Sequence, residues 1–349
     1  MYCLKDLLLI GIKMHASDIH LYCNAPPVFR VNGELIKLKG ELITSSDTKS
    51  MVEEILKESI IKYKEAYEYD TTYEINNLGR FRVNVFKEKG NDAIELRIIN
   101  NDIPSLEDIH CPEIVKDFTK ENSGLILVTG CTGSGKSTSI ASMINEINNT
   151  RACHIITLED PIEYIFENNK SIINQREIGR DTKDFDKGLK ASLREDPDVI
   201  FIGEVRNGDE IRTAIKAAET GHLVLTTLHT MGAVETIERI INAFPKEEQN
   251  EIKIRLSMIL KGIIYQKLIK RYDNKERIAA FEVINVTSSV KNLIREGKIH
   301  QIQAAMQTGK KDGMMTIDMF LVYLYNKGYI SKNGMLINCR DKSYIYTIF

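Results

Sequence analysis

The stretch GCTGSGKS, Gly130–Ser137, decides the fold of the larger part of this chain. It fits the pattern G-x-x-x-x-G-K-[ST] and lies between an apolar strand-like run, LILVT, and the start of a helical segment. Glycines at these positions let the backbone curl so that its amide groups point at phosphate oxygens. Lys136 would reach the β and γ phosphates of ATP, and the Ser137 hydroxyl would bind Mg²⁺.

A glycine-rich turn without a ligand is the alternative reading of this motif, and the flanking strand and helix favour the phosphate site. The predicted nucleotide-binding residues are Thr132, Gly133, Ser134, Gly135, Lys136, Ser137 and Thr138.

The segments around this loop predict an α/β fold. From Gly124 onward, apolar runs such as GLILVTG and DVIFIGE alternate with helical segments. Continuous apolar strands indicate a parallel sheet covered by helices. Beyond Pro245 the chain is predicted to be mostly helical, with FEVINV as a possible further strand and three helical pieces between residues 288 and 328.

The first hundred residues have a different pattern. Short strand-like runs surround one helical stretch, SDTKSMVEEILKE, which predicts a small α+β domain. Pro104 and Pro112 interrupt the segment that follows, so we place a boundary near Asn101. We therefore expect a domain at 1–100, a linker at 101–112 and a domain at 113–349 whose C-terminal helical region begins at about 288.

Composition limits the partners and the compartment. Lysines and arginines number 47 against 49 acids, a formal charge of -2, which argues against nucleic acid as the main partner. The six cysteines form no CxxC pair and no spacing typical of a secreted disulfide scaffold. The chain begins without a secretion signal and has no apolar run near the roughly 18 residues of a membrane span. We expect a cytoplasmic protein without direct membrane insertion.

Nucleotide hydrolysis needs a carboxylate near the metal and another near the attacking water. Asp198 and Glu204 flank the run VIFIG, and six residues of strand at ~3.3 Å each separate them by about 20 Å. Ligands bind at the carboxyl ends of parallel strands, which predicts that Glu204 lies at the site and Asp198 at the far edge.

Further polar residues are predicted at the same edge. The run HIITLEDPIEY ends in Glu159, Asp160 and Glu163, any one of which could be the general base; a solvated loop carboxylate is the alternative for each. A third strand is bounded by His222 and His229, for which structural and catalytic roles are both open. His229 closes the strand, so it is the better candidate to sense the γ-phosphate.

Five motifs, in this order and spacing, resemble those of the secretion ATPases of type II secretion and type IV pili: HASDIHL, GCTGSGKST, EDPIEY, LREDPDVIFIGE and TGHLVLTTLHT. SSVKNLIREGKIHQI and MQTGKKDGMMTIDMFL further resemble the C-terminal signature of the PilT-type retraction ATPases. His15, Lys291 and the segment LTTLHT depart from the retraction pattern. The resemblance implies a PAS-like N-terminal domain, a RecA-like P-loop ATPase domain and a ring of six subunits.

The resemblance also assigns residues. It implies that Glu163 is the general base and that Glu204 is an atypical Walker B residue that holds Mg²⁺ through water. His222 and His229 match the family's His box. Arg82 and Arg97 match N-terminal arginines that approach the nucleotide, although by pattern alone they would be solvated strand residues.

The resulting expectation is a cytoplasmic, homo-hexameric ATPase motor that powers type IV pilus retraction at the inner face of the cell membrane. It would act on an inner-membrane platform protein of the pilus. Two alternatives remain: a pilus assembly or type II secretion ATPase, and a nucleotide-binding scaffold or switch without significant hydrolysis.

Overall fold

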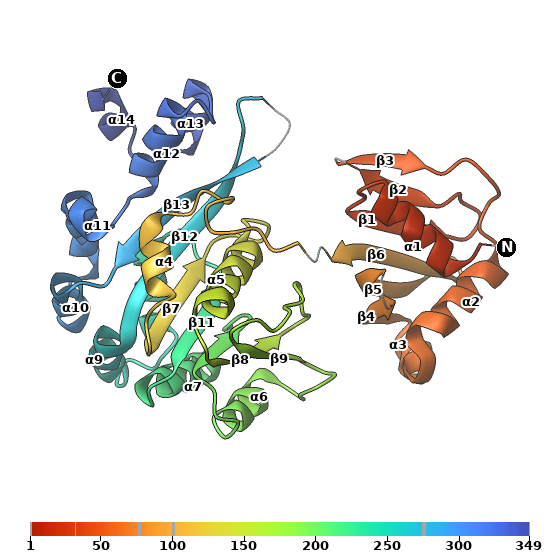
Figure 1. Ribbon diagram of the computed structural model, residues 1–349, viewed down its shortest axis with the longest axis horizontal. Helices are drawn as coiled ribbons and strands as arrows, with labels where there is room; N and C mark the ends of the chain where they lie inside the picture. The colour runs from red at the N-terminus through yellow and green to blue at the C-terminus, as the bar shows by residue number, and fades with distance from the viewer. Residues whose placement is uncertain (1, 32, 76–77, 100–101, 274–276, 349) are drawn as a thin grey trace. The chain divides into compact units, whose positions relative to one another are not determined.

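The computed structural model describes residues 2–31, 33–75, 78–99, 102–273 and 277–348 (Figure 1). The chain divides into two compact units, Met1–Asp102 and Ile103–Phe349. Asn101, where the sequence places the domain boundary, lies outside the described residues.

The N-terminal unit is built on an antiparallel sheet with the strand order β3-β2-β1-β6-β5-β4. Its strands are β1 (Asp18–Tyr22), β2 (Val28–Val31), β3 (Glu34–Lys37), β4 (Glu68–Ile75), β5 (Gly79–Glu88) and β6 (Asn91–Ile99). Its helices are α1 (Leu4–Lys13), α2 (Ser45–Leu56), the 3-10 turn η1 (Lys57–Ser59) and α3 (Ile60–Ala66). The predicted helix corresponds to α2, whose first turn is closed by a capping box between Thr44 and Asp47.

Helix α1 was not predicted, although its sequence carries the signal. Leu4, Leu7, Leu8 and Gly11 are buried at the three-to-four-residue spacing of one helix face. The apolar face packs on the sheet and completes the core of this unit.

The second unit contains a seven-stranded sheet with the order β13-β12-β7-β11-β10-β8-β9. The strands are β7 (Gly124–Thr129), β8 (His154–Glu159), β9 (Ile172–Glu177), β10 (Val199–Ile202), β11 (Leu223–Leu228), β12 (Leu260–Lys270) and β13 (Arg277–Asn285). The strands from β12 to β9 pair in parallel, and β13 pairs antiparallel with β12. Every residue of β7, β10 and β11 is buried, which confirms the parallel sheet predicted from continuous apolar runs.

Helices connect and cover these strands (Figure 1). The central ones are α4 (Glu113–Phe118), α5 (Lys136–Thr150), α6 (Phe185–Ser192), α7 (Gly208–Glu219), α8 (Ala233–Asn242) and α9 (Gln249–Ile259). The C-terminal ones are α10 (Ser288–Arg295), η2 (Ile299–Gln301), α11 (Ile302–Thr308), η3 (Gly309–Asp312), α12 (Ile317–Asn326), α13 (Lys332–Asn338) and α14 (Lys342–Ile348).

Beyond Pro245 the chain contains more helix than strand, as predicted, and the possible strand FEVINV falls at the end of β13. One strand of this segment was not predicted: residues 260–270 form β12, which lies between β13 and the phosphate-loop strand β7. The run GIIYQKLI is rich in β-branched residues, and both of its sheet neighbours satisfy its backbone hydrogen bonds. Strand β9 at the opposite edge was also not predicted.

None of the helices in the described ranges is long and apolar enough to cross a membrane.

Candidate nucleotide site

The loop between β7 and α5 has the backbone that phosphate binding requires. Gly133 and Gly135 have φ angles of +74° and +89°, in the left-handed region that favours glycine. A Cβ on Gly130 would lie 2.6 Å from Ser134 Oγ, so this position tolerates only glycine. The loop then enters α5 at Lys136, which directs the first amides of the helix toward the loop.

Lys136 is the first residue of α5, and it is only 9% exposed. Its Nζ donates hydrogen bonds to the carbonyls of Gly130 and Cys131, at 2.8 and 3.0 Å. Burial lowers the lysine pKa, and the charges of Glu204, Cys131 and Glu163 oppose that change. Both predicted carboxylates therefore lie within electrostatic reach of the lysine.

Gln266 of β12 supports the loop from behind, a role that the sequence analysis missed. Its Nε2 donates a 2.7 Å hydrogen bond to the Ser134 carbonyl, and the residue is 1% exposed. A Cβ on Gly135 would lie 2.9 Å from the same Nε2, so the glycine allows this close approach. The role of Gln266 follows from the pairing of β12 with β7, and the sequence analysis did not predict that pairing.

Among the described residues, two buried polar atoms at the loop have no hydrogen-bond partner: Ser134 Oγ in the loop and Gln266 Oε1 in β12. An unpaired buried hydroxyl is costly unless a ligand pairs with it. The Ser134 hydroxyl and the glycine cradle therefore fit a bound phosphate group.

Glu204 lies two residues after the end of β10, and hydrogen bonds join its segment to both neighbouring strands. The Gly203 amide donates to the Leu158 carbonyl at 2.8 Å, and Thr227 Oγ1 donates to the Gly203 carbonyl at 2.6 Å. These bonds fix the backbone from which the Glu204 carboxylate extends. Asp198 lies before β10, where it accepts from the His154 amide at 2.8 Å, so the expectation of opposite edges is confirmed.

The Glu204 carboxylate lies between two basic side chains. Its Oε1 accepts from Arg206 Nε at 3.1 Å, and its Oε2 is 3.5 Å from His229 Nε2. Arg206 also lies 3.8 Å from Asp160 Oδ2, and its hydrogen bond to Glu204 raises the pKa of the guanidinium. Arg206 was not predicted as a site residue, although it lies only two residues after Glu204.

The three acids that follow or end β8 differ in their surroundings. Glu159 is buried, and its Oε1 accepts from Thr157 Oγ1 at 2.6 Å and from Gln175 Nε2 at 3.2 Å. Burial raises the pKa of Glu159 to about 7, against these hydrogen bonds. Asp160 and Glu163 are exposed, and the Glu163 amide lies 3.5 Å from Glu159 Oε2.

The loop that carries Glu163 is attached to the phosphate-loop helix. The Tyr164 hydroxyl and Thr138 Oγ1 are 2.9 Å apart, and the Tyr164 carbonyl accepts from Gln175 Nε2 at 2.7 Å. The exposed carboxylate of Glu163 therefore lies on a loop that is anchored on either side.

The structure does not bring His222 to this edge. Parallel pairing places Leu223 opposite Gly124 and Leu228 opposite Thr129, so His222 lies at the start of β11 and the phosphate loop lies beyond its end. The His222 Nδ1 is 3.0 Å from the Ala217 carbonyl, which is a local structural contact.

Arg82 and Arg97 belong to the N-terminal unit, in β5 and β6. They are direct cross-strand partners and both are exposed. Arg97 Nε lies 2.9 Å from Asp18 Oδ1. Two like charges opposite each other destabilise a strand pair, so this arrangement is not explained by the stability of the sheet.

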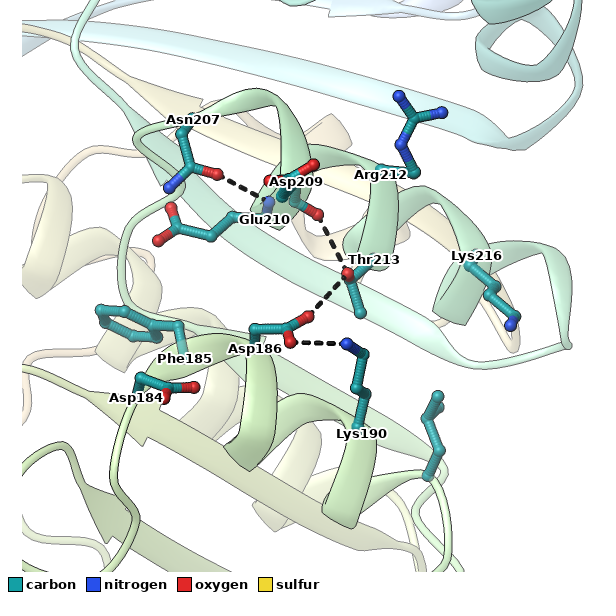
Figure 2. Close-up of a pocket in the computed structure, with 11 residues that line it drawn as sticks. Asp184, Phe185, Asp186, Lys190, Asn207, Asp209, Glu210, Arg212, Thr213 and Lys216 are labelled. Carbon is teal, nitrogen blue, oxygen red and sulfur yellow. Dashed lines mark hydrogen bonds and ion pairs between the residues drawn. The ribbon is translucent and has the colours of Figure 1, made fainter.

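A separate pocket of about 540 Å³ lies between α6 and α7 (Figure 2). Acidic side chains outnumber basic ones in its lining: Asp184, Asp186, Asp209 and Glu210 against Lys190, Arg212 and Lys216. Figure 2 shows some of the bonds within this lining: Asp186 accepts from Thr213 and from Lys190, and the Glu210 amide donates to the Asn207 side chain. An acidic lining repels a polyphosphate, so this pocket fits a nucleotide less well than the phosphate loop does.

A Mg²⁺ ion at the phosphate loop would need only one or two ligands from the protein. The described residues include no group of three or more His, Cys, Asp or Glu side chains that could hold a metal. Mg²⁺ typically uses one or two protein oxygens and completes its shell with water and phosphate oxygens. The Ser137 hydroxyl and the Glu204 carboxylate, whose side chain is 28% exposed, meet that requirement.

The comparisons with known proteins show the family of the chain. The family described as Type II/IV secretion system protein matches residues 4–334. Over 343 residues the chain is 40% identical to the Pseudomonas aeruginosa protein named "Type IV pilus retractation ATPase PilT", and the match covers 98% of both chains. Over 306 residues it is 42% identical to the Neisseria gonorrhoeae "Twitching motility protein", covering 87% of this chain and 82% of that protein.

A solved structure shares the whole architecture. It is described as "Crystal Structure of the Pilus Retraction Motor PilT and Bound ADP", and it matches with a TM-score of 0.93 and 41% identity over 99% of this chain and 100% of that chain. The match confirms the expected fold, a PAS-like N-terminal domain followed by a RecA-like domain. On the strength of this family match and of these relatives, the chain belongs to the type II/IV secretion system protein family and is one of its ATPases.

Proposed function

We propose that this protein is an ATP-driven motor that powers the retraction of type IV pili. One observation carries the catalytic part of the proposal: Glu204 and Glu163 both lie close enough to Lys136 for their charges to raise its pKa, against the effect of burial. The retraction part is supported by relatives that match most of this chain and carry pilus-retraction and twitching-motility names.

In the proposed site, residues of the phosphate loop bind the nucleotide. The amides around Gly133 and Gly135 and the Lys136 ammonium bind the phosphates of ATP, and Thr132, Ser134 and Thr138 complete the loop. Ser137 binds Mg²⁺ directly and Glu204 binds it through water. When bound, Mg²⁺ neutralises the charge that develops on the phosphates.

Glu163 is the proposed general base. Its carboxylate is exposed on an anchored loop, whereas Glu159 is buried and Asp160 faces Arg206. A base near the γ-phosphate accepts a proton from the attacking water as the bond to phosphorus forms. His229 contacts Glu204 and senses the γ-phosphate, and the proposal gives His222 no catalytic role in its own subunit.

The remaining parts of the proposal concern assembly. Six copies would form a ring at the cytoplasmic face of the inner membrane, where the ring acts on a platform protein of the pilus. Arg82 and Arg97 would contribute positive charge to the nucleotide of the ring, which gives a reason for two arginines to face each other on an exposed strand pair. A monomer in light scattering with every nucleotide would contradict the ring.

The experiment that tests the catalytic assignment is steady-state ATP hydrolysis by the wild type and by Glu163→Gln. Loss of a general base should lower turnover roughly a hundredfold while nucleotide binding is kept. Glu167→Gln is the matched control, because it removes an exposed carboxylate from the same loop. If turnover fell equally in Glu163→Gln and Glu167→Gln, or did not change in Glu163→Gln, then Glu163 would not be the general base.

No hydrolysis by the wild type would favour the scaffold alternative. The assembly alternative is separated by deleting the gene: cells that lose a retraction motor keep their surface pili, whereas cells that lose an assembly motor have none.

A further inference from the structure

A buried carboxylate joins the C-terminal helices to the ATPase sheet. Glu282 of β13 is 0% exposed, and it accepts hydrogen bonds from the Ala233 amide at 2.8 Å and from the Ile317 amide at 3.4 Å. Ala233 and Ile317 are the first residues of α8 and α12. A negative charge is favoured at helix N-termini, so Glu282 stabilises the start of two helices at once.

Arg340, between α13 and α14, neutralises this carboxylate. Its Nη1 lies 3.2 and 3.1 Å from the two oxygens of Glu282, and its guanidinium lies 5.2 Å from the centre of the Tyr265 ring. The Arg340 amide donates to Asp318 Oδ1 at 2.8 Å, which fixes the backbone of this segment to α12. The backbone of Arg340 is therefore fixed by a C-terminal helix.

The same guanidinium reaches the loop that follows β11. Arg340 Nη2 donates a hydrogen bond to the carbonyl of Met231, two residues after His229. Gly232 follows, and a Cβ there would lie 2.4 Å from Arg340 Nη2, so glycine is needed for this contact. The loop is thus bound at one end by the His229 contact to Glu204 and at the other by Arg340.

We propose that Arg340 is a positioning residue for ATP hydrolysis, which holds the loop carrying His229 in place through the Met231 carbonyl and the Glu282 carboxylate. The inference rests on the proposed function, because it assigns Arg340 a part in the same site. It makes the C-terminal helices part of the support of the hydrolytic site.

The choice of residues supports a positioning role over simple stabilisation. A buried ion pair adds little net stability compared with apolar residues of similar size, whereas it defines a geometry. Arginine presents several donors in a rigid fork, and here one nitrogen contacts the carboxylate and the other contacts the loop carbonyl. Neither a lysine nor an apolar residue could make both contacts at once.

The test compares the turnover and the KM of Arg340→Met with those of the wild type. Misplacement of His229 should lower kcat about tenfold or more, while the KM for ATP stays within about twofold, since the phosphate loop itself is unchanged. Arg340→Lys, which keeps a charge beside Glu282, should recover part of the lost turnover.

Arg255→Met is the matched control. Arg255 makes a two-nitrogen contact with the Glu219 carboxylate at 2.7 and 2.7 Å, joining α9 to α7 away from the His229 loop. Loss of this pair should leave kcat unchanged below the melting temperature. An equal fall of kcat in both variants would mean that Arg340 acts only through stability and would overturn the inference.

A double-mutant cycle with His229→Ala decides whether Arg340 acts through His229. Adding Arg340→Met to His229→Ala should lower kcat by no more than about twofold further, because the group being positioned is already absent. If Arg340→Met lowered kcat as much in the His229→Ala background as it does in the wild-type background, the inference would be overturned. If Arg340→Met does not fold, the same cycle is run with Arg340→Lys.

Failure of the inference and failure of the proposed function give different results. Wild-type hydrolysis that depends on Glu163 but not on Arg340 would overturn only the inference. A wild type that binds ADP but does not hydrolyse ATP would overturn both.

Discussion

Glu159→Gln should remove a pH dependence of folding stability that the wild type shows near neutrality. Glu159 is 7% exposed, and burial raises the pKa of its carboxyl from 4.5 to about 7. Glutamine resembles the protonated acid in size and keeps an oxygen that can accept from Thr157 and Gln175.

The sign follows from the direction of the pKa shift. A carboxyl that ionises less readily in the folded state gives its full stability below pH 4.5, and this stability is lost as the pH rises through about 7. A shift of about 2.5 pKa units corresponds to about 3 kcal/mol. For a unit of this size, that loss lowers the melting temperature by about 6–12 °C.

The assay is thermal melting of the wild type and Glu159→Gln from pH 5 to pH 8. The two proteins should melt at similar temperatures at pH 5, and the wild type should melt lower at pH 8 by the amount given above. Glu167→Gln, which changes an exposed carboxyl, should follow the wild type. Parallel curves for Glu159→Gln and the wild type would refute the raised pKa of Glu159.

Three further substitutions test contacts around the site. Gln266→Leu should weaken ADP binding about tenfold, because the buried Ser134 carbonyl loses a partner worth about 1–3 kcal/mol; unchanged affinity in a titration would contradict its supporting role. Arg82→Thr should stabilise the N-terminal unit by about 0.2–1 kcal/mol, since it removes the like charge opposite Arg97, yet lower ATP turnover. If the melting temperature and the ATP turnover of Arg82→Thr changed in the same direction, the proposed role of Arg82 at the nucleotide would be contradicted. Tyr164→Phe should lower kcat about threefold without changing KM, because the loop loses one hydrogen bond of about 1 kcal/mol to α5; unchanged kcat would show that this bond does not position the loop.

The parts of the site that sequence could predict are those set by short-range chemistry. The phosphate loop is specified by adjacent glycines, and the place of Glu204 follows from the direction of one strand. The residue pattern alone left Glu159, Asp160 and Glu163 open as the general base, and only the family resemblance favoured Glu163. The structure distinguishes them because burial and hydrogen bonds depend on β9 and α5, which lie at other points of the chain.

The features that sequence missed depend on distant partners. Gln266 supports the loop only because β12 pairs with β7, more than 130 residues earlier. Arg340 and Glu282 are 58 residues apart, and nothing in either local sequence marks them as a pair. Helix α1 is the exception, since its periodic apolar face was present in the sequence.

The place of β12 in the sheet has a consequence for the order in which the protein forms during synthesis. Strand β7 pairs with β11 on one side and β12 on the other, and both are made about a hundred residues or more after it. Until β12 has emerged from the ribosome, β7 has an unpaired edge and the phosphate loop lacks Gln266, so such a chain is prone to pair with other strands. We expect ribosome-bound chains that end at residue 259 not to be retained on immobilised ATP, and chains extended well beyond residue 285 to be retained. The nucleotide site, although encoded near the middle of the chain, would be among the last parts of the unit to become functional.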